Sequence, residues 1–388
     1  MGSFMPFAVY LLGLAVFAQG TSEFMLSGLI PEIAADLRVS VPAAGLLTSG
    51  FAVGMIVGAP LMAALSLRWP RRRTLAIFLT TFVVVHVLGA LTTSYEVLLV
   101  TRVAGALANA GFWATALATA NAMVPSNAKA RATSIVVGGV TVACVAGVPA
   151  GAWLGQEWGW RSAFWAVALI SLPPLIAILR TIPAGRPETA DTGVRGELRS
   201  LRDSRLLVIL LVAALVNGAT FCAFTYLAPL FTTDTGLGAG WVPALLALFG
   251  VGSFLGVTIG GRVGDTRPVP LLAIGMVALI AGWSLFAMTS GSVVATVVLV
   301  LVQGTLAFAT GSTLISRVFY VAEGAPTLAG GFATAAFNVG AAVGPWLGGV
   351  AIGTGAGFRA PLWVSAAMMV AALAVAVTAL GIRKRALR

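Results

Sequence analysis

The chain has 388 residues, of which 59% are hydrophobic and only 9% are charged, and its mean hydropathy is +1.01. A soluble domain carries about 25% charged residues, so this chain has too few charges to cover a water-facing surface. The formal net charge of +11 does not indicate a nucleic-acid-binding protein, because the basic residues gather in particular loops. We therefore predict an all-α protein that crosses a membrane repeatedly.

Twelve segments are long and apolar enough to cross a bilayer, which takes about 20 helical residues. The segment between the sixth and seventh spans, residues 181–204, is the longest polar stretch and is predicted to be a cytoplasmic linker. It divides the chain into a six-helix N-terminal half, residues 1–180, and a six-helix C-terminal half, residues 205–388. The predicted spans are residues 7–30, 42–66, 74–93, 97–123, 132–156, 162–180, 206–231, 241–262, 269–289, 293–319, 327–353 and 360–382.

The basic residues lie mainly in alternate loops. Most of the 23 Lys and Arg residues fall on the side of the chain termini, whereas the loops of the other side hold Arg38, Arg161 and Arg359. The positive-inside rule therefore predicts that both termini are cytoplasmic. Only Lys129 and Lys384 are lysines, a bias toward Arg that suggests a bacterial genome, so we expect a bacterial inner membrane. The net charge thus reflects topology, and we expect no nucleic-acid partner.

The two halves repeat each other at a separation of 198 residues. QGTSEFMLSGLIP (residues 19–31) aligns with NGATFCAFTYLAP (217–229), and FAVGMIVG (51–58) aligns with FGVGSFLG (249–256). Six-helix repeats in parallel orientation are typical of transporters in which the solute site lies near the bilayer midplane. We predict two pseudo-symmetric halves around a central cavity.

Glu23 and Arg102 are charged residues inside predicted spans. Helix rise places Glu23 about 10 Å and Arg102 about 9 Å below the same membrane face. A charge at this depth is costly and indicates a functional site with a partner, so we predict that the two pair and that Glu23 carries a proton. The alternative is a structural ion pair between spans one and four. The residue that corresponds to Glu23 is Phe221, so the repeat does not require an acid there.

Several other polar residues within the spans are candidates for the solute site. Gln19, Asn109, Asn217 and Asn338 either line the cavity or join helices by hydrogen bonds. The single histidine, His86, is either a satisfied packing group or part of a proton relay. No cluster suggests a metal or hydrolase site, and no phosphate-binding Gly-x-x-x-x-Gly-Lys-Ser/Thr loop occurs. We therefore expect neither an enzyme nor a cofactor, and transport driven by the proton gradient.

The loop after span two resembles a signature of the major facilitator superfamily. AALSLRWPRRRTL (residues 63–75) is similar to the family's Gly-x-Leu-Ala-Asp-Arg-x-Gly-Arg-Arg, with Leu67 in place of the Asp. The corresponding loop GRVGDTRP (261–268) keeps the acid. In the family this loop clamps the cytoplasmic side between the halves. The residues to which the resemblance gives this role are Arg68, Arg71, Arg72 and Asp265.

Three spans resemble further motifs of the family. Arg102, in LLVTRVAGALANAG, stands where the family has an intramembrane Arg that serves proton coupling. GGVTVACVAGVPAGAWLG (138–155) is similar to the drug-antiporter motif, and GAAVGPWLGG (340–349) gives a tighter version of it. The residues that the resemblance places at the moving seam between helices are Gly147, Pro149, Gly151, Gly344 and Pro345.

The resemblance covers essentially the whole chain, and it is to the twelve-span drug:proton antiporter branch, in particular actinobacterial chloramphenicol-efflux proteins. Residues 5–55, 106–120 and 330–345 resemble those proteins closely. The resemblance implies antiport of protons and a small lipophilic drug such as chloramphenicol, by alternating access, in a monomer that confers antibiotic resistance. Two alternatives stay open: efflux of a sugar or another endogenous metabolite by the same fold, and a membrane receptor or scaffold without transport.

Overall fold

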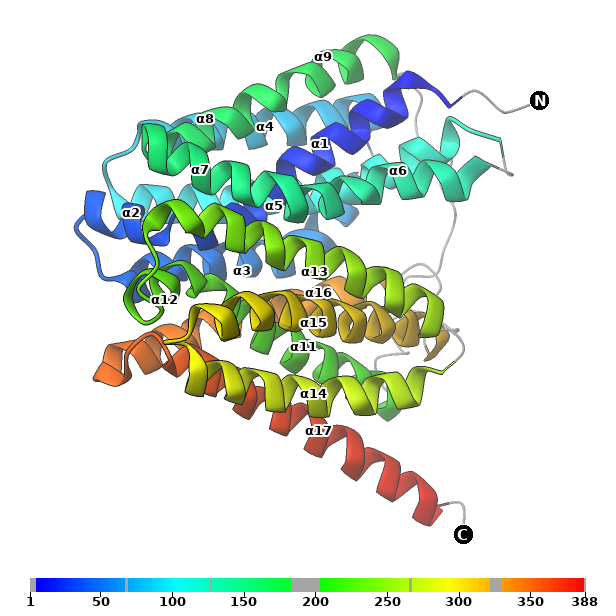
Figure 1. Cartoon of the computed structure of the whole chain (residues 1–388). Helices are drawn as coiled ribbons and strands as arrows, with labels where there is room; N and C mark the ends of the chain where they lie inside the picture. Colours follow the sequence, from blue (N-terminus) through cyan, green and yellow to red (C-terminus); the bar gives the residue numbers. More distant parts are fainter. Residues whose placement is uncertain are drawn as a thin grey trace. The chain divides into compact units, whose positions relative to one another are not determined.

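The computed structural model describes residues 5–66, 69–125, 128–182, 203–264, 267–321 and 329–386. All regular secondary structure in these ranges is helical, and 12 helical segments are long and apolar enough to cross a membrane. The chain is therefore an all-α, multi-pass membrane protein, as its composition predicts (Figure 1).

Each of the first six spans consists of one helix or of consecutive helical segments. They are α1 (Phe7–Phe24) with the 3₁₀ turn η1 (Met25–Gly28); α3 (Val41–Ser66); α4 (Arg71–Leu91); α5 (Tyr95–Ala122); α6 (Lys129–Val142) with the π-helical turn η3 (Ala143–Gly147) and α7 (Val148–Trp158); and α8 (Arg161–Ile170) with α9 (Leu172–Thr181). The short helix α2 (Ile30–Asp36) lies between the first two spans.

The last six spans follow the same plan. They are α11 (Ser204–Thr225); the 3₁₀ turn η5 (Ala239–Trp241) with α13 (Val242–Val263); α14 (Pro268–Thr289); α15 (Val293–Val321); α16 (Ala329–Ala351) with the π-helical turn η6 (Ile352–Ala356); and α17 (Ala360–Ala386). The short helix α12 (Leu227–Thr233) follows α11.

The chain divides by its internal contacts into two compact units. Unit 1 comprises Met1–Ser40 and Gly50–Ala190, and unit 2 comprises Val41–Ser49 and Asp191–Arg388. In unit 1, α1 packs along α6, and α4 packs against α5 and α8. In unit 2, α13 packs along α15, and α11 packs against α16 and α17. Most of the predicted linker, residues 181–204, lies outside the described residues.

The sequence repeat is visible in how the first span of each unit ends. In unit 1 the helix α1 gives way to the short helix α2, and in unit 2 α11 gives way to α12. Pro31 and Pro229 fall in the first turn of these short helices. A proline is tolerated there because a first-turn amide hydrogen has no partner within the helix. The repeated prolines therefore mark a repeated break in the helix.

Span five changes its winding just before Pro149. Proline has no amide hydrogen to donate, and its ring clashes with the carbonyl group four residues earlier, so a regular α-helix cannot continue unchanged through it. The π-helical turn η3, Ala143–Gly147, lies directly before α7 and accommodates this mismatch.

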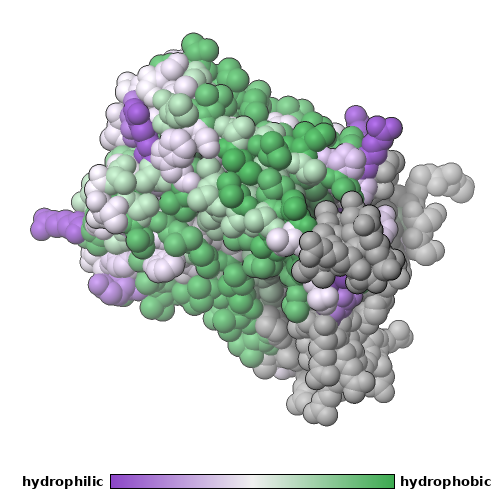
Figure 2. All heavy atoms as spheres, turned by 90° about the horizontal axis from the view of Figure 1, so that it is seen from below, coloured by the Kyte–Doolittle hydropathy of each residue, from purple (hydrophilic) through white to green (hydrophobic). Residues whose placement is uncertain are grey.

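The outer surface of the helices is apolar. In Figure 2, hydrophobic side chains cover the middle of the visible face, and hydrophilic ones lie toward its ends. Phe7, Ile274 and Trp346 are 71%, 69% and 51% exposed. Water-soluble proteins rarely expose contiguous apolar patches of this kind, so the surface fits a protein whose solvent is lipid.

Candidate functional site

Arg102 is buried in unit 1, where Ser22 binds it. The side chain is 2% exposed. Its Nη1 donates to Ser22 Oγ at 2.8 Å, and its Nη2 donates to the Ser22 carbonyl oxygen at 2.9 Å. The Cζ atom also lies 4.4 Å from the centre of the Phe51 ring, a cation–π contact. These two hydrogen bonds and the Phe51 ring thus replace part of the hydration that the Arg102 guanidinium loses on burial.

Glu23 follows Ser22 in α1 and is half-buried. The predicted pairing of Glu23 with Arg102 is not a direct ion pair, because the pairs within 4.0 Å among the described residues are Asp36–Arg161 and Asp234–Arg359. Successive helical residues point about 100° apart, so Ser22 and Glu23 project in different directions, and it is Ser22 that meets the guanidinium. Arg102 still acts on Glu23 electrostatically.

His86 of α4 extends this contact into a network. It is 3% exposed, its Nε2 lies 2.6 Å from Ser22 Oγ, and its Nδ1 lies 2.7 Å from the Phe82 carbonyl oxygen. The sequence left its role open and did not single out Ser22. Depth could have indicated His86: α4 ends at Leu91, five residues later, which places His86 near the depth of Arg102.

Two buried amides of unit 1 have unused polar atoms. Gln19 is 0% exposed, and neither Oε1 nor Nε2 has a partner among the described residues. Asn109 donates from Nδ2 to Met55 Sδ at 3.6 Å, and its Oδ1 has no partner in the same part of the chain. An unsatisfied buried polar group costs about 1–3 kcal/mol. Gln19 and Asn109 are therefore candidates to bind a polar group of a solute.

The two candidate amides of unit 2 already have partners within the protein. Asn217 of α11 donates from Nδ2 to the Phe337 carbonyl oxygen of α16 at 2.7 Å. Asn338 donates from Nδ2 to the Thr334 carbonyl oxygen of its own helix at 2.9 Å. Each amide thus has a structural bond, and a role in solute binding stays a prediction.

The predicted motif glycines of span five lie against α1. A Cβ atom on Gly147 would overlap Thr21 Oγ1, and one on Gly151 would lie 3.1 Å from Met25 Cβ. Small residues at such positions let helix backbones approach closely. The motif of span five therefore brings η3 against α1 and α7 against η1.

The corresponding motif of span eleven lies against α11. A Cβ atom on Gly344 would overlap the Gly218 carbonyl oxygen. The Tyr226 hydroxyl donates to the carbonyl oxygen of Pro345, at 2.9 Å. Pro345 lies inside α16. Both halves thus place the predicted seam motif against their first span.

The predicted cytoplasmic clamp falls only partly on described residues. Arg68 and Asp265 lie outside them. Arg71 and Arg72 begin α4 and are half-buried. The clamp therefore stays a prediction.

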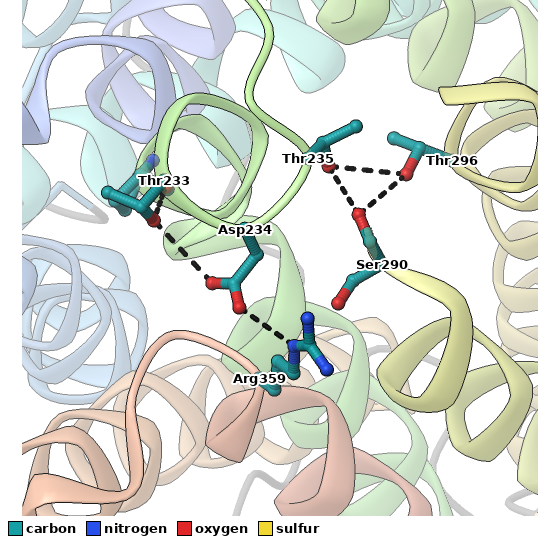
Figure 3. A network of polar contacts seen from close by, with 7 residues as sticks. Thr233, Asp234, Thr235, Ser290, Thr296 and Arg359 are labelled. Atoms are coloured by element: carbon teal, nitrogen blue, oxygen red, sulfur yellow. Dashed lines mark hydrogen bonds and ion pairs between the residues drawn. The ribbon is translucent and has the colours of Figure 1, made fainter. Parts of the chain in front are cut away.

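A polar network joins the loops at the end of unit 2 where α12 lies. Arg359 Nε donates to Asp234 Oδ1 at 2.8 Å, and Thr235 Oγ1 donates to the Ser290 carbonyl oxygen at 2.7 Å (Figure 3). Thr235 Oγ1 also lies 3.3 Å from Thr296 Oγ1. The network ties the segment after α12 to the start of α15 and the residue before α17.

Comparison with known proteins identifies the family. The model of the Major Facilitator Superfamily matches residues 12–327. The chain belongs to the major facilitator superfamily. It is 53% identical over 375 residues to a chloramphenicol resistance protein of Streptomyces lividans, with 96% of each chain covered. The resemblance to chloramphenicol-efflux proteins is thereby confirmed, and the protein belongs to a transporter family.

More distant relatives agree with this assignment. The chain is 35% identical over 356 residues to the inner membrane transport protein YdhP of Escherichia coli (strain K12), with 89% of each chain covered. A crystal structure of a bacterial homologue of the human lysosomal transporter Spinster, inward-facing and unoccupied, matches it with a TM-score of 0.75 at 18% identity. That match covers 95% of this chain and 94% of the other, so the major facilitator fold extends over nearly the whole protein.

Proposed function

We propose that the protein exports chloramphenicol, or a similar small lipophilic drug, in exchange for protons. The observation that carries the proposal is Glu23, a half-buried acid in the first span without an ion-pair partner within 4.0 Å among the described residues. An intramembrane acid in this state can gain and lose a proton, which a proton-coupled carrier requires. The similarity to the Streptomyces lividans resistance protein supports a drug as the solute.

Proton and drug compete for the surroundings of Glu23 in this mechanism. When the carrier faces the cytoplasm, drug binding displaces the proton; when it faces outward, reprotonation of Glu23 expels the drug. Moving one charge across the membrane yields about 2.3 kcal/mol per 100 mV. One proton per neutral drug molecule therefore sustains a drug gradient of tens-fold, because about 1.4 kcal/mol corresponds to a factor of ten.

Gln19 and Asn109 supply polar contacts to the drug. Their unpaired amide atoms offer one donor group and two acceptor oxygens in apolar surroundings. Arg102 keeps the surroundings of Glu23 positive, and its Nε also lacks a partner among the described residues. A neutral drug with a few polar groups matches this lining better than a sugar, which needs many more hydrogen bonds.

The proposed setting is a bacterial cytoplasmic membrane, with both termini in the cytoplasm and the monomer as the working unit. No cofactor takes part, because the proton gradient supplies the free energy.

The experiment that tests the proposal measures chloramphenicol transport in proteoliposomes under an imposed pH gradient. Wild type should move drug against its gradient. Glu23→Gln should abolish this coupled movement, whereas the exposed control Glu157→Gln should behave as wild type. Proton-driven transport retained by Glu23→Gln would reject the coupling role. A panel that includes sugars separates drug export from metabolite efflux, and absence of flux for every solute would favour a receptor or scaffold.

A further inference from the structure

The bonds of His86 fix the direction of a hydrogen-bond chain. The Phe82 carbonyl oxygen can only accept, so the Nδ1 atom 2.7 Å away must carry a hydrogen and donate it. In a neutral imidazole the other nitrogen, Nε2, is then an acceptor, and Ser22 Oγ donates to it over 2.6 Å. The lone pairs of Ser22 Oγ are left for Arg102 Nη1, at 2.8 Å. The chain runs from Arg102 through Ser22 and His86 to Phe82.

A protonated His86 would break this chain. Both ring nitrogens of an imidazolium are donors, so Ser22 Oγ would receive a hydrogen from each side and its own hydrogen would lose its acceptor. Two cations would then face each other across one hydroxyl group. The observed contacts therefore favour the neutral Nδ1–H tautomer.

Unit 2 builds the same helix arrangement without any member of this chain. Ser22 corresponds to Thr220, whose Oγ1 donates to the Val216 carbonyl oxygen within α11. At the 198-residue separation, His86 corresponds to Ser284, and at the 199-residue separation of span four, Arg102 corresponds to Leu301. The fold thus forms in unit 2 without a buried arginine and its acceptors, so this helix arrangement does not by itself require the hydrogen-bond chain of unit 1.

We infer that His86 is a positioning residue: through the Ser22 hydroxyl, it holds Arg102 away from the Glu23 carboxylate. The inference rests on the proposed function, because it explains why Glu23 stays free to exchange a proton. A bidentate ion pair with Arg102 would fix Glu23 in its charged form, since such pairs are strong hydrogen bonds. With the guanidinium bound by Ser22, its charge acts on Glu23 without that direct contact.

Few other charged or titratable groups lie near the hydrogen-bond chain of Arg102, Ser22 and His86. Arg102 of α5 and Glu23 of α1 are the charged side chains that act at this point, and Arg102 is the one that acts on His86. Cys144 of η3 is a further titratable group, and the charge of Glu23 acts on it. The ring of Phe164 from α8 lies 5.8 Å from that of His86 between centres. Among the described residues, the partners of Ser22 Oγ are His86 Nε2 and Arg102 Nη1, and neither Glu23 nor Cys144 bonds to it.

The first test observes His86 directly. It is the only histidine of the chain, so protein purified with a tag that lacks histidine and labelled with ¹⁵N-histidine gives one pair of ring-nitrogen signals in NMR. We expect a protonated Nδ1 and an unprotonated, hydrogen-bonded Nε2 between about pH 5 and 8, the range in which an ordinary histidine titrates. Ser22→Ala should remove the hydrogen bond at Nε2 and leave Nδ1 unchanged. An Nε2–H tautomer or an imidazolium overturns the inference.

The second test measures chloramphenicol binding against pH in the purified protein. Ser22→Ala and His86→Phe release Arg102 Nη1 to turn toward Glu23, while Nη2 keeps its bond to the backbone carbonyl oxygen of residue 22. The midpoint of the binding titration should then fall by about one pH unit or more, as expected for a new close opposite charge. Ser22→Thr and His86→Gln keep a hydroxyl and an acceptor and should keep the wild-type midpoint. Ser171→Ala is the matched control, because Ser171 is equally buried and donates to the Val167 carbonyl oxygen away from Arg102.

The outcomes separate the inference from the proposed function. If the pH midpoint of chloramphenicol binding is unchanged in Ser22→Ala, the positioning role of His86 is overturned. This variant removes only the hydroxyl group, so it changes the packing little. If Glu23→Gln keeps the wild-type pH dependence, the coupling role of Glu23 fails, whereas the NMR signals of His86 still decide whether the hydrogen-bond chain exists.

Discussion

Asp36 and Arg161 form an ion pair in unit 1 that unit 2 repeats with Asp234 and Arg359, each 198 residues further along the chain. In both units the acid ends or follows the short helix after the first span, and the arginine comes at the start of the last span. Arg161 also donates to the Thr92 carbonyl oxygen at 2.8 Å. On the membrane side whose loops hold few basic residues, Arg161 thus joins loops within unit 1 and Arg359 joins loops within unit 2.

The ion pair of Asp36 with Arg161 should contribute little to the free energy of unfolding, and this contribution should depend on pH in a defined way. The hydrogen bond from Arg161 holds the pKa of Asp36 below its ordinary value of 3.8. Its contribution is therefore complete above pH 3.8 and is lost as the pH falls through the lower, folded-state pKa. A double-mutant cycle of Asp36→Asn and Arg161→Gln should give a coupling of about 1 kcal/mol or less, because the pair is partly exposed.

Chemical unfolding in mixed micelles measures this coupling. It should be present at neutral pH and vanish in strong acid. A coupling that grows on acidification would contradict the assignment, and the parallel cycle on Asp234 and Arg359 is the matched comparison.

Glu32 should destabilise the protein at neutral pH. It lies in α2, outside the spans, and burial raises its pKa above the ordinary value of 4.5, against an opposing backbone hydrogen bond. Its Oε2 is buried without a partner among the described residues. Because folding favours the protonated form, stability falls as the pH rises from 4.5 through the folded-state pKa.

Glu32→Gln removes this penalty. The variant should be more stable than wild type at neutral pH, and the difference should shrink to nothing below pH 4.5, which unfolding curves at two pH values can measure. A stability difference that is the same at both pH values would show that the charge of Glu32 is not its cause.

Gly147 should tolerate no side chain beside Thr21. The Cβ atom of Gly147→Ala would overlap Thr21 Oγ1, so the variant should lose about 1–3 kcal/mol of stability, the usual cost of overpacking. Thr21→Ala removes the obstructing atoms and should restore part of the loss. Gly344→Ala meets the Gly218 backbone instead, so no side-chain substitution should rescue it. Thermal unfolding of the single and double variants checks this contrast, which equal rescue at both sites would refute.

Gln19 and Asn217 correspond to each other in the repeat but should respond in opposite ways. Gln19→Leu removes a buried amide with no partner among the described residues, so it should raise stability by about 1 kcal/mol while weakening drug binding. Asn217→Leu breaks the 2.7 Å bond to Phe337 and should lower stability by about 0.5–1.5 kcal/mol. Unfolding curves and chloramphenicol binding on the same samples test both. If Gln19→Leu binds drug as wild type does, Gln19 does not contact it.

The fold could be predicted from the sequence because its signals are local. Span length and composition indicated the helices that the structure contains, although the predicted seventh span, residues 206–231, runs through the break between α11 and α12. The site could be predicted only in part. Depth along a helix brought Arg102 and Glu23 to one level, but it could not say which α1 side chain the guanidinium meets, since that depends on the rotation of the helix about its axis.

What the sequence determined by itself is therefore the membrane-spanning, repeated, twelve-helix architecture and the two buried charges, since each follows from composition and spacing along the chain. What only the tertiary structure decided is their chemistry. Arg102 bonds to Ser22 and not to Glu23, and His86 supplies the acceptor behind Ser22. Such contacts join residues 64 and 80 positions apart, and their geometry depends on how α1, α4 and α5 pack, which no local pattern in the chain encodes.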